Sequence, residues 1–305
     1  MNALAVCGIL SAVIYALLFN FTLVKIFLIF GGLYGVCSWI FVGLSASKYN
    51  NARRKIMICT WSDPVGPEIY GCIKMNFENA AKFLNELQEK TGKHITYVHL
   101  VLKTIGEMLK EFPDLNGRLT QGCYAPNSSI DVSFMVPVDE RNISYPICIK
   151  SIDQKNLAEI SEEVEKGVKE AQNKKEIALL KYVPTCFRGV LCEIRAWLTV
   201  SLGLHIPFLG SLSYPSGHCL VSDISYTELD TIYLPFTPSL RSPVSFVINS
   251  VKPEPCVING APAVQSFLTL TGTIDHRYLD GVRAAKAQNK IKEILENPAN
   301  FFKLD

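Results

Sequence analysis

The residues of this sequence that could do chemistry gather near its carboxyl end, in the stretch TLTGTIDHRYLDG at 269–281. His276 stands where a run of β-favouring residues ends, and Asp280 follows it four positions later. An imidazole takes up a proton near neutral pH, so His276 can act as a general base toward a nucleophile that loses its proton as it attacks. Asp280 has a supporting role in this interpretation, because its carboxylate can cap a following helix or pair with an arginine.

The surrounding sequence must supply the elements that hold this histidine. Apolar residues recur at three-and-four spacing over 96–111, and acids near the start and lysines toward the end suit a helix dipole over 156–172. β-Branched and alternating runs indicate strands. We therefore expect helices at 77–90, 96–111, 156–172 and 282–296 and strands at 130–138, 242–251 and 266–274. His276 is then predicted to lie on the turn between the last strand and the closing helix.

The amino-terminal region reads as membrane sequence. Residues 3–46 contain one charge, Lys25. A bilayer crossing needs about 20 apolar residues, and two stretches of nearly that length predict a transmembrane helical hairpin within residues 1–48. One long tilted span is the alternative. The basic stretch KYNNARRK at 48–55 then places residues 49–305 on the cytosolic or mitochondrial matrix side of an integral membrane protein.

Composition limits what the remaining chain can bind. The net charge of +2 and the lack of a basic stripe interleaved with aromatic residues argue against nucleic acid as a partner. The ten cysteines form no Cys-x-x-Cys pair, and the sequence has no P-loop, so we expect no metal and no tightly bound cofactor. Residues 49–305 read as one α/β domain without internal repeats.

Three stretches, in this order, carry a family resemblance: TYVHLVLKTIGEMLKEFPDLNGRL at 96–119, NLAEISEEVEKGV at 156–168 and LTLTGTIDHRYLDGVRAAKAQNKIKEILENP at 268–298. Together they resemble the catalytic domain of the dihydrolipoamide acyltransferases of 2-oxo-acid dehydrogenase complexes. The resemblance implies an α/β, chloramphenicol acetyltransferase-like fold, a mixed sheet with helices packed on it, here preceded by the transmembrane anchor. It also implies coenzyme A or acyl-CoA as a substrate, and a homotrimer whose active sites take the histidine and a serine from different chains.

The resemblance assigns that serine by position. The family places a serine hydroxyl on a strand, where it donates to the oxyanion of the tetrahedral intermediate, and the matching stretch CLVSDIS at 219–225 puts Ser222 in this role. The loop that follows departs from the family's glycine-rich sequence, so an ordinary solvated serine at a strand end is the alternative interpretation.

Two further departures shape the functional hypotheses. We expect no lipoyl domain in this chain, so the acceptor of the acyl group is expected to come from elsewhere. An apolar insertion at 182–210 is either a helix in the membrane interface or an extra core or trimer-contact helix. One hypothesis is a membrane-anchored, CoA-dependent acyltransferase that uses His276, Ser222 and Asp280. The other is a non-catalytic trimeric membrane scaffold or assembly protein that retains the fold.

Overall fold

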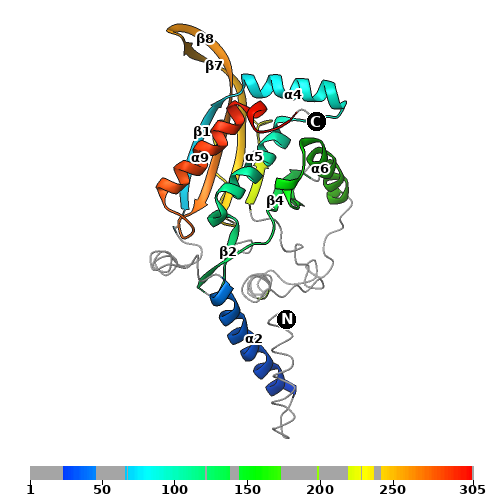
Figure 1. The fold of residues 1–305 in the computed structure, drawn as a ribbon, viewed down its shortest axis with the longest axis vertical. Helices are drawn as coiled ribbons and strands as arrows, with labels where there is room; N and C mark the ends of the chain where they lie inside the picture. Colours follow the sequence, from blue (N-terminus) through cyan, green and yellow to red (C-terminus); the bar gives the residue numbers. More distant parts are fainter. Residues whose placement is uncertain are drawn as a thin grey trace.

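The fold is built around a mixed six-stranded sheet (Figure 1). The computed structural model describes residues 23–45, 66, 68–120, 122–137, 144–172, 198, 219–227, 229–236 and 242–303. The strand order is β1-β8-β7-β6-β4-β5, in which β4, β6 and β7 run parallel and the other neighbours are antiparallel. The strands are β1 (Glu68–Asn76), β4 (Val132–Pro137), β5 (Ser144–Ile149), β6 (Cys219–Asp223), β7 (Val244–Ile258) and β8 (Ala261–Asp275). A separate hairpin pairs β2 (Gly117–Thr120) with β3 (Cys123–Pro126).

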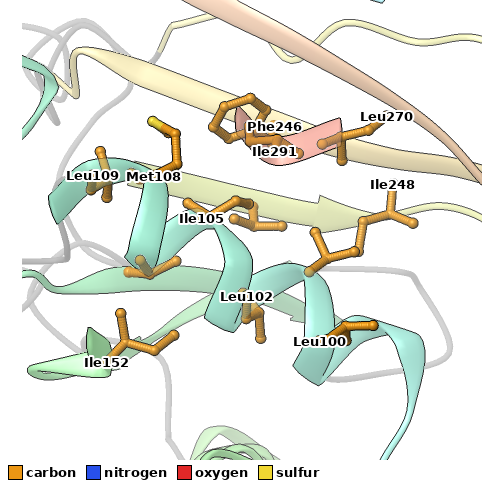
Figure 2. Close-up of a cluster of buried hydrophobic side chains, with 14 of the residues drawn as sticks. Leu100, Leu102, Ile105, Met108, Leu109, Ile152, Phe246, Ile248, Leu270 and Ile291 are labelled. Atoms are coloured by element: carbon orange, nitrogen blue, oxygen red, sulfur yellow. The ribbon is translucent and has the colours of Figure 1, made fainter. Parts of the chain in front are cut away.

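Helices cover one face of the sheet, and the hydrophobic core lies between the two layers. Figure 2 shows side chains of α5 (Tyr97–Glu111) meeting Phe246 and Ile248 from β7, Leu270 from β8 and Ile291 from α9 (Gly281–Glu296). All of these are buried. Burying each such side chain contributes about 1.5–3 kcal/mol, so the packing of α5 and α9 on β7 and β8 holds the carboxyl end of β8 in place.

The predicted helices are confirmed, with ends shifted by at most one residue. They are α4 (Glu78–Thr91), α5 (Tyr97–Glu111), α6 (Leu157–Gln172) and α9 (Gly281–Glu296). Gly92 ends α4 in the left-handed conformation, at a φ of 65°, which a glycine adopts without the steric cost of a Cβ. Thr96 begins α5 as the N-cap of a capping box that His99 completes.

The strands β7 and β8 are longer than expected and form one continuous hairpin of two 15-residue strands. Its far end projects beyond the rest of the sheet (Figure 1). The turn is Asn259-Gly260, with positive φ values of 50° and 82°, the combination that two-residue hairpin turns favour. The predicted strands covered 242–251 and 266–274, and the parts of β7 and β8 that they left out contain Pro253, Pro255 and Pro262. Proline is uncommon inside strands.

The amino-terminal prediction falls largely outside the residues that the structure describes. A helix, α2, covers Leu23–Ser45. Within the described part of the chain, no helix combines the length and the apolar character that crossing a bilayer requires. The first half of the expected hairpin lies outside the described residues, as does the insertion at 182–210 apart from Leu198.

Candidate active site

His276 lies on the bend between β8 and α9, as the sequence predicts. The last strand residue, Asp275, is fixed through its backbone: its N–H donates to Pro243 O at 2.9 Å, and its carbonyl accepts from Tyr278 N at 3.0 Å. These bonds close a tight turn around the histidine at the point where β8 leaves the sheet. The backbone under the imidazole is therefore held from both sides.

A buried ion pair brackets the histidine. Arg277 Nε donates to both carboxylate oxygens of Asp275 at 3.0 Å, and Arg277 Nη2 donates to Oδ2 at 2.7 Å. The side chains are 5% exposed for Asp275 and 12% for Arg277. The Arg277 N–H also donates to Asp275 Oδ1 at 2.9 Å. A charge-assisted fork of this kind is among the stronger polar contacts in proteins, and it fixes the residues on each side of His276.

Tyr278 anchors the bend to another part of the fold, a role that the sequence did not predict. Its hydroxyl accepts a hydrogen bond from Leu119 N at 2.9 Å. Its ring packs edge-on against Tyr124, with ring centres 6.0 Å apart. Both tyrosines are fully buried. The turn that carries His276 is thereby attached to the β2–β3 hairpin.

Asp280 caps the helix that follows the bend. Its Oδ1 accepts from Arg283 N at 3.0 Å, and its backbone is extended, as an N-cap residue requires. The negative carboxylate also stands at the positive end of the dipole of α9. Asp280 thus fixes the direction of the chain four residues after the histidine.

The imidazole of His276 is half-buried, and its two nitrogens differ. Nδ1 is enclosed and has no hydrogen-bond partner among the described residues. The accessible part of the ring therefore excludes Nδ1, which leaves Nε2 as the nitrogen that can meet a reacting group. His99 differs from His276, because burial lowers its pKa to about 4 and it serves the capping box of α5.

The structure places Ser222 on β6, away from His276 in the same chain. The strand register aligns Ser222 with Val247 on β7, and Val247 with Thr271 on β8. His276 lies five residues beyond Thr271, so at about 3.3 Å per residue roughly 16 Å of strand separates the two. A single chain does not bring these side chains together.

Ser222 also lies on the sheet face opposite the helices. Its neighbours Cys219 and Val221 belong to the hydrophobic core under the helices, and side chains alternate along a strand. No group of three or more histidine, cysteine or acidic residues suited to a metal is found in the described regions.

These features were compared with known proteins. The family model of the 2-oxoacid dehydrogenases acyltransferase (catalytic domain) matches residues 47–178 and 219–303. The chain belongs to this family. Its acyltransferase domain is 22% identical over 236 residues to the lipoamide acyltransferase component of the branched-chain α-keto acid dehydrogenase complex of Bacillus subtilis. The match covers 76% of this chain and 47% of that protein, so the chain spans about half the length of this relative.

Solved structures confirm the fold of the acyltransferase domain. A probable dihydrolipoamide acetyltransferase from Listeria monocytogenes superposes with a TM-score of 0.57 at 19% identity, covering 80% of this chain and 89% of that one. The dihydrolipoamide acetyltransferase of Azotobacter vinelandii gives a TM-score of 0.58 at 15% identity, with 82% and 88% covered. The predicted mixed-sheet acyltransferase fold is therefore correct.

Proposed function

We propose that this chain is a CoA-dependent acyltransferase with His276 as its general base and no tightly bound cofactor. One observation carries the proposal: an ion pair, a tyrosine anchor and a helix cap all converge on the bend that presents this imidazole. Rigid positioning of this kind is what acid–base catalysis requires, because a base must lie within hydrogen-bond reach of the proton it abstracts.

In the proposed reaction, Nε2 of His276 removes the proton from an acceptor thiol, hydroxyl or amine as that group attacks the thioester carbonyl carbon. The carbonyl electron pair moves onto oxygen and forms a tetrahedral oxyanion. When the carbonyl re-forms, the carbon–sulfur bond breaks, and the imidazolium returns the proton to the sulfur of CoA. The acyl group has then moved to the acceptor, and the histidine is neutral again.

Ser222 is proposed to donate a hydrogen bond to the oxyanion from a neighbouring protomer of a homotrimer. The separation of about 16 Å along the strands within one chain supports a shared site, because no rotation of either side chain closes that distance. The Azotobacter vinelandii structure comes from work on a serine, a histidine and an asparagine in that enzyme's catalytic mechanism, with the last two spaced four residues apart. His276 and Asp280 have the same spacing.

The proposal includes attachment to a membrane through residues 1–48, with residues 49–305 on the cytosolic or matrix side. Its support is the single charge in residues 3–46 and the outward-facing Leu28, Phe41 and Leu44 of α2, which are 71%, 46% and 70% exposed. Extraction of membranes with alkaline carbonate tests it. We expect the full chain to stay in the membrane pellet, and release into the supernatant would contradict attachment through this segment.

The test of activity is CoA release, measured as free thiol, from a panel of acyl-CoA donors of increasing chain length with candidate acceptors. We expect turnover by the full chain and a loss of about 10²–10⁴-fold in His276→Ala, the range that a general base contributes. His94→Ala is the matched control, because this imidazole is exposed and outside the site. Equal turnover by His276→Ala would overturn the proposed base. A folded assembly without turnover would favour the scaffold hypothesis.

A further inference from the structure

The turn that follows Ser222 is closed by its own hydrogen bonds. Asp223 Oδ1 accepts from Ser225 N at 2.9 Å, and Thr227 N donates to Ile224 O at 2.8 Å. Ile224 N donates to Ile248 O of β7 at 3.0 Å, so the turn begins in register with the sheet. These contacts shape the turn, but they do not connect it to the helical layer.

Tyr97, the first residue of α5, makes that connection. Its hydroxyl donates to Asp223 Oδ2 at 3.3 Å and lies 2.6 Å from Ser225 Oγ. Burial raises the pKa of Tyr97 above its usual value, so the phenol keeps the proton that it donates to the carboxylate. The hydroxyl of Ser225 then donates to the phenol oxygen. One tyrosine therefore contacts two side chains of the turn.

Tyr97 is itself held firmly. The N-cap Thr96 immediately precedes it, and the Thr96 N–H donates to His99 Nδ1 at 3.0 Å. The Tyr97 ring also packs edge-on against Phe77, with ring centres 6.5 Å apart. A side chain fixed at both its backbone and its ring can impose its position on the group that it contacts.

We propose that Tyr97 is a positioning residue for Ser222, acting through Asp223 and Ser225. Successive side chains on a strand point to opposite faces, so holding Asp223 against α5 on the helical side directs the Ser222 hydroxyl toward the face opposite the helices. The inference rests on the proposed role of Ser222 in oxyanion binding. It adds Tyr97 of α5 as the residue that orients the Ser222 hydroxyl.

Ile232, further along the same loop, is secured independently. Asn249 Oδ1 accepts from Ile232 N at 2.6 Å, and Asn249 Nδ2 donates to Thr271 Oγ1 at 2.9 Å. Thr271 Oγ1 donates to Ile232 O. Because these buried side chains hold residue 232 on the sheet, removing the Tyr97 hydroxyl should loosen the turn next to Ser222 and leave residue 232 attached.

The test is Tyr97→Phe in the full chain, which deletes one oxygen and keeps the ring on Phe77. We expect kcat for CoA release to fall about tenfold, since small misplacements of catalytic groups are costly, with KM for acyl-CoA unchanged. Tyr226→Phe is the matched control: it removes a hydroxyl from the same turn, at a residue 69% exposed with no hydrogen bond in the described structure. We expect wild-type kinetics from it.

A double-mutant cycle separates positioning from general loosening. If Tyr97 acts through the Ser222 hydroxyl, Tyr97→Phe should change kcat less than twofold in a Ser222→Ala background. The same tenfold loss in both backgrounds, or wild-type kcat in Tyr97→Phe alone, would overturn the inference while leaving His276 as base. A chain with no turnover overturns both this inference and the proposed function.

Discussion

Asp280 caps α9, the helix that follows the bend carrying His276. Asparagine is as good an N-cap residue as aspartate, whereas alanine offers no acceptor, so the two substitutions separate capping from charge. We expect Asp280→Ala to lower the free energy of unfolding by about 1 kcal/mol and Asp280→Asn to lower it by a few tenths at most. Urea denaturation followed by circular dichroism measures both. Equal losses in the two variants would show that the carboxylate serves something other than the cap.

We expect the buried ion pair of Asp275 with Arg277 to contribute more to the free energy of unfolding than an exposed ion pair does. Replacing Asp275 with Asn leaves a guanidinium that is 12% exposed facing an uncharged amide. Breaking a buried pair from one side costs about 3–5 kcal/mol, and we expect a loss near the lower end, with CoA release falling in parallel. The control is Glu162→Gln, which breaks the exposed pair with Lys93 and should leave the unfolding midpoint unchanged. Similar losses of stability in Asp275→Asn and Glu162→Gln would show that burial does not make the Asp275 ion pair more important for folding.

The sequence predicted the roles of residues whose partners lie close to them in the chain. The four-residue spacing of His276 and Asp280 is local, so the bend and the cap could both be predicted. Tyr278 lies between them, yet its partner Leu119 is 159 positions away. The sequence does not show which distant backbone group a tyrosine contacts, so the anchoring role of Tyr278 could be recognised only from the structure.

The capping box at the amino-terminal end of α5 depends on the protonation state of His99. His99 Nδ1 accepts from Thr96 N, which requires an unprotonated nitrogen, and burial lowers the pKa of His99 from 6.5 to about 4. Between these values the unfolded chain binds a proton that the folded chain does not, so stability falls as the pH falls from 6.5 toward 4. The loss contributed by this residue reaches up to about 3 kcal/mol. Above pH 6.5 no loss is expected.

His99→Gln tests this dependence. A glutamine at the third helical position can complete a capping box without titrating, so the variant should resemble the parent chain at pH 7.5 and be the more stable of the two at pH 4.5. Thermal unfolding across this range measures the difference in slope. Parallel pH profiles for the two chains would show that His99 contributes nothing to acid sensitivity.

The hairpin of β7 and β8 shows why element ends were predicted unevenly. Helix ends carry short-range signals, such as Thr96 before α5 and Gly92 after α4, and these were predicted correctly. The Asn259-Gly260 turn is an equally local signal, but the predicted strands ended before it, and the segments between them and the turn contain prolines. They are tolerated in a hairpin that projects beyond the sheet, where few neighbouring strands need their missing N–H groups.

The strand order of the sheet separates Ser222 from His276, the two residues that the proposed reaction brings together. Ser222 and His276 both lie at or near strand ends, but β7 stands between β6 and β8 and runs antiparallel to β8. Nothing in the sequence specifies this order, since parallel and antiparallel neighbours are chosen by crossovers far apart in the chain. The resemblance supplied the idea of a shared site, and the register gives it a geometric basis.

Mixing two impaired chains tests the shared site directly. His276→Ala keeps the serine and Ser222→Ala keeps the histidine. A site formed between protomers is therefore intact wherever the histidine of a Ser222→Ala chain faces the serine of a His276→Ala chain. If the chains form cyclic trimers at random from an equal mixture, three quarters of the trimers are mixed and each holds one intact site in three, giving about a quarter of wild-type turnover. The mixture should be co-expressed, so that subunits exchange before assembly, and CoA release compared with each variant alone. Turnover no higher than the average of the two variants would mean that each chain completes its own site, which would require Ser222 to be replaced by another donor near His276.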